Sequence, residues 1–471
     1  MSASVTVRMY NQHNLGDCFL LKFEAGNKKS FMLIDFGSYT SGNDEREIEI
    51  ARSIKDTVHK EPLIVVLTHQ HKDHLSGFIT AKEIIDDLNI TEVWFSFLDD
   101  PTGKEAKAMR KATEKFWKKN KENKSKTKLK FNGVAAVEKM LAAKEGFDLF
   151  AEDQTGGEAI TNLLEWSNNN CQFLVPGKNF DMPGLPAESV RVYVLGPPTD
   201  PTLLRKLNPG KNDAVNSLNA MMQLSNLDTS SKLVGDSLDT ILNNQPLSSH
   251  GVADNFPFNR KFIYPLNNSN QNLLIEKVYI NPSMTWRRID HDWLSELGRV
   301  SLHMDTLTNN SSLVLAFELV ISKKVVLFVG DAQIGNWKSW FDIAFEDSEV
   351  EARELLSRTV FYKAGHHSSH NATLLESLDL MNDKELVIMI PINKEVSEKM
   401  NFAMLKPGMM AGYNRKSKGR VLRSDTIFHD AGTSNKFKFK FAKQDKDFTP
   451  KLIQVKDEDK SSHLFIEYTV K

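Results

Sequence analysis

The stretch from Val66 to Gly77, VLTHQHKDHLSG, decides how the chain is interpreted. An apolar run ending at Leu67 leads into three histidines and an aspartate within six positions, although the chain has 13 histidines among 471 residues. These four residues are His69, His71, Asp73 and His74. Neutral imidazoles and carboxylates are common ligands of zinc and other first-row metals, and burying so many ionisable groups without a partner would cost free energy. The stretch therefore predicts a metal site just past the end of a buried strand.

Short apolar or alternating runs on both sides of this stretch are typical of β-strands. They are Val5–Met9, Phe19–Phe23, Phe31–Asp35, Leu63–Leu67, Glu92–Phe97, Val190–Leu195, Ser312–Ile321, Lys324–Val329, Thr359–Lys363, Leu386–Ile390 and Leu464–Val470. Apolar residues at helical spacing predict helices over Glu45–His59 and Ala81–Leu88. Strands interleaved with helices predict an α/β fold.

Composition narrows the classes of protein. Charged residues make up 26% of the chain and the net charge is -1, so no global charge points to nucleic acid. The two cysteines, Cys18 and Cys171, lie far apart, which argues against a disulfide framework or a thiolate zinc site. No signal-like N-terminus and no apolar window of about 18 residues is present. We therefore expect a cytoplasmic protein without a membrane partner.

Two distant strand ends carry further ligand types. Two neighbouring cations need roughly six to eight protein ligand atoms, so one short stretch cannot supply them all. Asp331 follows the apolar run Lys324–Val329, and its carboxylate could bridge two cations, the alternative being the N-cap of a helix. His366 and His367 follow the run Thr359–Lys363, and we expect one of them to complete the coordination. His370 is interpreted as a surface residue.

With these residues in place, the sequence resembles the metallo-β-lactamase superfamily, whose HxHxDH signature the histidine-rich stretch matches. More narrowly, it is similar to the ComEC-type branch of that superfamily. The matching elements are, in chain order, NLGDCFL at Asn14–Leu20, IDFG at Ile34–Gly37, LGPP at Leu195–Pro198, NNSSLVL at Asn309–Leu315, VGD at Val329–Asp331 and KAGHHSS at Lys363–Ser369. One departure is Ser368, which stands where the branch has the glycine of HHGS.

The resemblance implies a four-layer αβ/βα metallo-β-lactamase sandwich with long insertions. Residues 1–100 would form its first half, residues 101–189 a lysine-rich insertion and residues 190–400 the second half, with a further insertion around 205–300. Residues 401–471 would be a C-terminal extension with strands.

The resemblance also implies a site with two divalent cations, zinc first and manganese as the alternative. His69 and His71 would bind one cation, Asp73 and His74 the other, Asp331 would bridge, and the His366/His367 pair would complete both shells. Asp35 would hold a histidine ring by a hydrogen bond. The isolated histidine that relatives place before the bridging aspartate has no clear counterpart; the nearest candidates are His303, Asn309 and Asn310.

Two bridged cations generate hydroxide from water near neutral pH, which predicts a hydrolase. We expect Asp73 and Asp331 to act in catalysis with the cations, and Lys363 to contact a substrate phosphate or else to reach solvent. The ComEC-like features favour a phosphodiesterase, with a nuclease as the leading hypothesis. The segment Lys104–Lys130 could follow a nucleic-acid backbone, or be a solvated helix.

Alternatives are hydrolysis of a small phosphoester or other ester, and a non-catalytic metal-containing subunit of a protein complex. A protein partner or a second copy of the chain stays open.

Overall fold

A computed structural model describes residues 2–39, 43–104, 106–107, 154–204, 206, 308–369, 371–400, 404–425, 451–454 and 463–471. The chain divides into two compact units. One comprises Met1–Arg110, Gly146–Met221 and Asp305–Lys471, and all described residues belong to it; the other comprises Lys111–Glu145 and Met222–Met304. Several predictions lie outside the described residues: His303, His370, residues 108–130 of the lysine-rich segment, and most of the insertion around 205–300.

The first sheet contains the start of the chain. In the described part of the chain it has eight strands, in the order β14 (Lys451–Gln454), β15 (His463–Val470), β1 (Ala3–Tyr10), β2 (Cys18–Ala25), β3 (Lys28–Phe36), β4 (Pro62–Leu67), β5 (Asn89–Ser96) and β6 (Cys171–Leu174). The strands from β14 to β3 pair antiparallel, whereas β3, β4, β5 and β6 are parallel. The carboxyl ends of β3 and β4, which carry Asp35 and the histidine-rich stretch, therefore meet at one edge.

The second sheet is built in the same mixed manner. Its seven strands among the described residues follow the order β13 (Val421–Arg423), β12 (Val387–Ile390), β11 (Thr359–Lys363), β10 (Lys324–Phe328), β9 (Val314–Leu319), β8 (Val190–Gly196) and β7 (Asn179–Asp181). The strands from β10 to β13 are parallel and the others antiparallel. Parallel pairing of β10 with β11 brings the ends that lead to Asp331 and His367 together.

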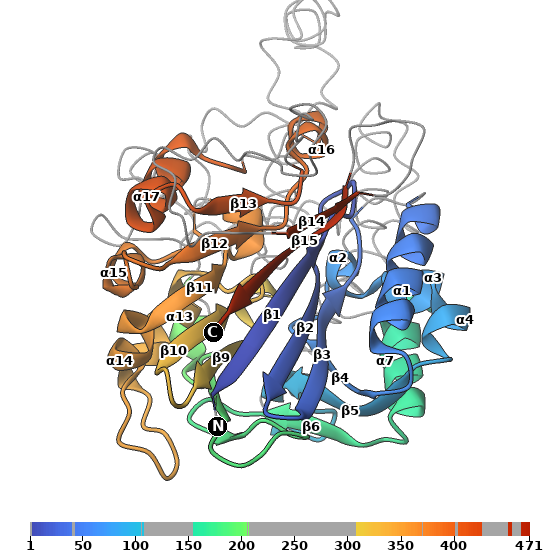
Figure 1. Ribbon diagram of the computed structural model, residues 1–471, viewed down its shortest axis with the longest axis horizontal. Helices are drawn as coiled ribbons and strands as arrows, with labels where there is room; N and C mark the ends of the chain where they lie inside the picture. Colours follow the sequence, from blue (N-terminus) through green and yellow to red (C-terminus); the bar gives the residue numbers. More distant parts are fainter. Residues whose placement is uncertain are drawn as a thin grey trace, which may run out of the picture. The chain divides into compact units, whose positions relative to one another are not determined.

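The two sheets pack face to face, with helices on their outer faces (Figure 1). Along β10, Val326 and Phe328 point into the cluster shared by both sheets, while Val325 and Leu327 point to the helices. Phe23 of the first sheet lies with its ring centre 5.1 Å from that of Phe317 of the second. Strands buried on both faces are apolar throughout, and this explains the continuous apolar runs in the sequence.

The helices divide between the two outer faces (Figure 1). The first sheet is covered by α1 (Asp44–Val58), α2 (Lys72–Leu75), α3 (Gly77–Thr80), α4 (Lys82–Ile85) and α7 (Gln154–Trp166). The second is covered by α13 (Ile334–Ser339), α14 (Ala352–Ser357), α15 (Leu375–Leu380), α16 (Lys394–Lys399) and α17 (Pro407–Ser417). A short helix, α8 (Pro201–Leu204), lies against α13. None of the described helices is both long and apolar enough to cross a membrane.

The α/β class predicted from the sequence is confirmed, and each predicted strand coincides with an observed one to within a few residues. Three elements arise where an insertion was expected: α7, β6 and β7 lie within residues 101–189 and belong to the two sheets and their helical cover. The C-terminal extension is part of the first sheet, because β15 pairs with β1.

Candidate metal centre

The residues proposed for the site converge at the strand ends. Asp35 is the last residue but one of β3, the histidine-rich stretch follows β4, Asp331 follows β10, and His367 follows β11. One further side chain, Asp17, comes from the loop between β1 and β2. Five separate segments of chain thus meet at one buried point.

Glycine makes this close approach feasible. Gly330, just before Asp331, has a φ of +51°, and a Cβ there would lie 2.9 Å from the Cβ atoms of both Ser312 and Thr68. The backbone of the two sheets is also joined at this point, because the amide of Leu313 donates a 2.9 Å hydrogen bond to the carbonyl of Thr68. A side chain at 330 would push the two ligand-bearing loops apart.

The ring orientation of His69 follows from its hydroxyl neighbours. Its Nδ1 lies 3.1 Å from Thr68 Oγ1 and 3.3 Å from Ser312 Oγ. Both hydroxyls donate their own hydrogen elsewhere, one to a carboxylate and the other to a backbone carbonyl. They must therefore accept from His69 Nδ1, which leaves a lone pair on His69 Nε2, 2.9 Å from Nδ1 of His71. Two nitrogens bound to one zinc ion lie about 3.3 Å apart, so this pair is close to a chelating arrangement.

Two further histidines are held in the same way. His74 Nδ1 donates to Asp35 Oδ2 at 2.8 Å, and His367 Nδ1 donates to the carbonyl of Pro391 at 2.7 Å. In each ring Nε2 then faces the carboxylates: His74 Nε2 is 3.4 Å from Asp331 Oδ2, and His367 Nε2 is 3.1 Å from Asp73 Oδ2. Fixing the outer nitrogen so that the inner one points at a cation is the usual support of a metal-binding histidine.

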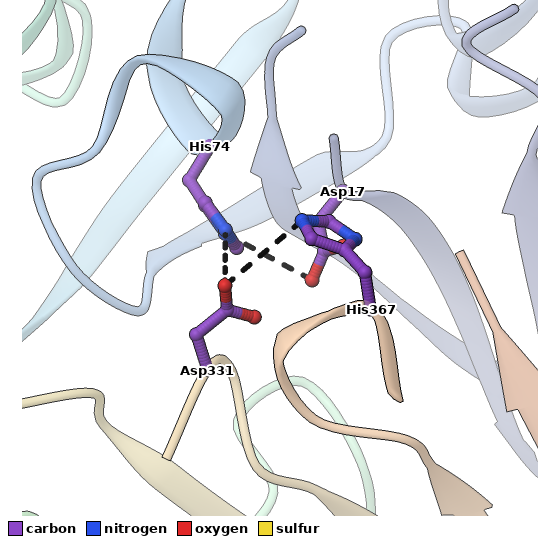
Figure 2. A group of neighbouring side chains, drawn as sticks. All are labelled: Asp17, His74, Asp331 and His367. Carbon is purple, nitrogen blue, oxygen red and sulfur yellow. Dashed lines mark ion pairs between the residues drawn. The ribbon is translucent and has the colours of Figure 1, made fainter. Parts of the chain in front are cut away.

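Carboxylates complete the cluster (Figure 2). Asp17, His74, Asp331 and His367 each offer one ligand atom, and these atoms all lie within 4.8 Å of one another. Asp17 Oδ1 is buried and accepts no hydrogen bond. A mixed set of imidazoles and carboxylates suits zinc or manganese, so the residues present fit the cations that the sequence predicts.

Lys363 is not exposed to solvent. Its side chain is 1% exposed, and its ammonium group contacts Asp17 Oδ2, Asp331 Oδ1 at 3.3 Å and the carbonyl of Gly330 at 2.7 Å. These three partners match its three hydrogens. The predicted alternative, a lysine that reaches solvent, is wrong, and the predicted contact of Lys363 with a substrate phosphate stays a prediction. The lysine instead joins the loop of Asp17 to that of Asp331.

The electrostatics show an excess of negative charge. Burial would lower the pKa of His74, but the charges of Asp331, Asp35 and Asp73 outweigh it and raise that pKa well above its ordinary value. In His367 burial is likewise outweighed, by the bond to Asp73 and the charge of Asp331, and the pKa is raised. The surrounding carboxylates thus favour the protonated form of both rings, and a bound divalent cation would take the place of the protons.

The other two histidines behave differently. Burial holds the pKa of His69 well below its usual value, with the neighbouring His74 and His71 adding to the effect. Burial lowers the pKa of His71 to about 4. Both rings are thus neutral near pH 7, which is the form that binds a metal.

His366 lies half-buried at the rim of the cluster, with both ring nitrogens hydrogen-bonded. Nδ1 is 2.8 Å from Ser369 Oγ, and Nε2 is 3.3 Å from Asn309 Nδ2. Its backbone amide donates to Asp331 Oδ1 at 3.0 Å. Of the two histidines that the sequence left open, His367 is the one whose ring nitrogen joins the cluster.

Asp17 was absent from the predicted site. Its sequence signal was the Leu15-Gly16-Asp17 turn, in which Gly16 has a φ of +150° and its Cβ position would fall on the carbonyl of Gly37. Such a tight contact beside an acidic residue marks a loop held against the site.

In comparisons with known proteins, no protein-family model and no curated protein matches the chain.

Proposed function

We propose that this chain is a metal-dependent hydrolase in which two divalent cations activate water. The observation that carries the proposal is the orientation of three rings, His69, His74 and His367, whose outer nitrogens are hydrogen-bonded so that their inner nitrogens converge. Structural histidines need no such arrangement. Three buried carboxylates and the half-buried Asp73, with one buried lysine beside them, need positive charge.

We also propose the four-layer metallo-β-lactamase fold, in its ComEC-type branch, for the described unit. Support comes from the two facing sheets with helices on each outer face. The motif residues of the resemblance also lie at adjacent strand ends rather than scattered over the surface.

In this proposal each residue has a distinct task. His69 Nε2 and His71 Nδ1 would hold the first cation, Asp73, His74 and His367 would hold the second, and Asp331 would serve both. Bound cations would supply a hydroxide near neutral pH and stabilise negative charge in the transition state. Asp35 orients His74, and Lys363 holds Asp17 and Asp331 at a fixed separation.

For the substrate we propose a phosphodiester of nucleic acid. Phosphodiester oxygens carry the negative charge that a dinuclear centre stabilises, and the lysine-rich segment Lys104–Lys130 supplies cations of the kind that contact a phosphate backbone.

The test is cleavage of labelled single-stranded DNA, double-stranded DNA and RNA with zinc or manganese supplied. We expect cleavage by the wild type and none by Asp331→Ala. If the wild type binds metal but cleaves no polymer, the nuclease assignment fails. A screen of small phosphoesters would then separate the esterase alternative from a non-catalytic subunit.

A further inference from the structure

A buried carboxylate lies on the apolar face of α1. Glu47 is 2% exposed, and it precedes Ile50 and Ala51, which pack against the first sheet, by three and four residues. Residues at this spacing share one face of a helix. Burying a carboxylate in an apolar layer costs free energy unless hydrogen bonds compensate it. The position of Glu47 therefore calls for a specific role.

Two serine hydroxyls from different segments of chain donate to this carboxylate. Ser38 Oγ donates to Glu47 Oε1 at 2.8 Å, and Ser76 Oγ donates to the same oxygen at 2.6 Å. The serines are also joined to each other, because the backbone amide of Ser38 donates to Ser76 Oγ at 2.8 Å. Ser38 belongs to the loop after β3, and Ser76 is the C-terminal cap residue of α2. One oxygen of Glu47 thus ties this loop to α2.

The two tied segments also carry the two partners of a hydrogen bond at the proposed metal centre. Asp35 lies next to the end of β3, directly before the loop, and His74 lies in α2. His74 Nδ1 donates to Asp35 Oδ2 at 2.8 Å. Asp35 is fixed independently of α2, because the amide and the hydroxyl of Thr68 donate to its two oxygens. The geometry of the bond between Asp35 and His74 therefore depends on the position of α2.

Tertiary contacts have to hold α2 in place, because it has only four residues and no side-chain hydrogen bond at its N-terminal cap. The loop after β3 lies directly on it: a Cβ at Gly37 would fall 2.5 Å from the amide nitrogen of Leu75 and 2.5 Å from the carbonyl oxygen of Lys72. The amide of Asp17 donates to the carbonyl of Asp73 at 3.0 Å. The bond from Ser76 to Glu47 connects α2 to the helix that covers the sheet.

We propose that Glu47 is a positioning residue for the second cation; this rests on the proposed dinuclear centre. It holds α2 against the loop after β3, so that Asp35 orients the ring of His74 toward the cation. An outer partner that fixes a histidine ring raises the metal affinity of that ring. The orientation of His69 has a different origin, the hydroxyls of Thr68 and Ser312. The influence of Glu47 should therefore fall on the second cation and not on the first.

The experiment measures Zn²⁺ affinity by calorimetry on the full chain without substrate, in two single-site backgrounds. His69→Ala removes a ligand of the first cation and leaves the second position to be measured, and His367→Ala does the reverse. Glu47→Leu should weaken Zn²⁺ binding about 10–100-fold in the His69→Ala background, as the loss of an outer partner does. It should leave the affinity in the His367→Ala background unchanged.

Conservative variants separate the hydrogen bonds from packing. Glu47→Gln keeps an oxygen that can accept from both hydroxyls, so it should restore most of the affinity that Glu47→Leu loses. Ser76→Ala is a milder change that removes one donor, and it should weaken the second position in the same direction as Glu47→Leu. The matched control is Glu45→Leu on the exposed side of α1, which should leave both positions unchanged.

Two results would overturn the proposal while the dinuclear centre stands. Equal weakening in both backgrounds would show that Glu47 only stabilises the fold, and unchanged affinity of the second position in folded Glu47→Leu and Ser76→Ala would show that α2 is held without it. If neither background nor the wild type binds Zn²⁺, the dinuclear centre itself fails and the proposal fails with it. Because no substrate is present, these outcomes are independent of whether the protein is a nuclease.

Discussion

Replacing Lys363 with methionine tests the buried charges of the site directly. The substitution keeps the aliphatic stem but removes the ammonium group that contacts Asp17, Asp331 and the carbonyl of Gly330. Asp17 would then keep only its longer ion pairs with His74 and His367, each at 3.8 Å. Removing one partner of a buried ion pair costs about 3–5 kcal/mol, because the other charge stays buried.

The measurement is urea unfolding followed by circular dichroism, with a chelator present. We expect Lys363→Met to lose about 3–5 kcal/mol, a large part of an ordinary folding free energy. Saturating Zn²⁺ should recover part of the loss, because bound cations compensate the same carboxylates. The matched control is Lys324→Met, which breaks an exposed pair with Glu385 and should cost at most about 1 kcal/mol.

A double variant decides whether the loss comes from this charge pair. Asp17→Asn removes the carboxylate that Lys363 compensates. The double variant Asp17→Asn/Lys363→Met should therefore lose less unfolding free energy than the two single variants lose together, by about 1 kcal/mol or more. Strictly additive losses, or a Lys363→Met protein within about 0.5 kcal/mol of the wild type in chelator, would refute the reasoning.

Three further predictions concern other parts of the unit. Burial, with the charge of Arg46 adding to it, lowers the pKa of His463 to about 4, so the unfolded chain binds its proton below about pH 6.5 and the folded chain does not. The free energy of unfolding should therefore fall as the pH drops through this window. In urea titrations between pH 7 and pH 5, His463→Gln should lose about 2 kcal/mol less unfolding free energy than the wild type. Gly330→Ala puts a Cβ 2.9 Å from Thr68 and Ser312 at a positive φ. The variant should lose about 1–3 kcal/mol of unfolding free energy and bind metal more weakly in calorimetry. Normal metal affinity would show that the two loops can move apart without harm to the site. Tyr413→Phe removes the hydroxyl that contacts Thr373 Oγ1 at 2.7 Å, in a chain of hydroxyls that reaches the amide of Gly365. The variant should lower cation affinity several-fold. A change in the melting temperature alone would show that Tyr413 only packs.

The sequence was most informative where a ligand residue directly follows an apolar strand. Asp331 and the histidines after Leu67 and Lys363 were found this way, because parallel strands place their carboxyl ends at one edge and the apolar runs show where the strands end. The α/β class followed from the same runs.

Residues whose setting depends on a distant partner were not predictable. Asp17 lies in the matching stretch Asn14–Leu20, but that stretch does not show its burial against Lys363, which lies far along the chain. Asn309 and Asn310 are adjacent and identical, and only the three-dimensional contacts of each amide distinguish them. The strands β6 and β7 have four and three residues, too few for a clear alternation, and they follow a lysine-rich segment that suggested an insertion.

The number of cations that the wild-type chain binds tests the central claim most directly. Metal-free protein would be titrated with Zn²⁺ and the bound metal counted by native mass spectrometry, with Asp331→Ala in parallel. We predict two zinc ions per wild-type chain and loss of at least one in the variant, because Asp331 lies between the two proposed positions. A wild-type chain that is folded but binds no zinc in the native mass spectrum would contradict the account.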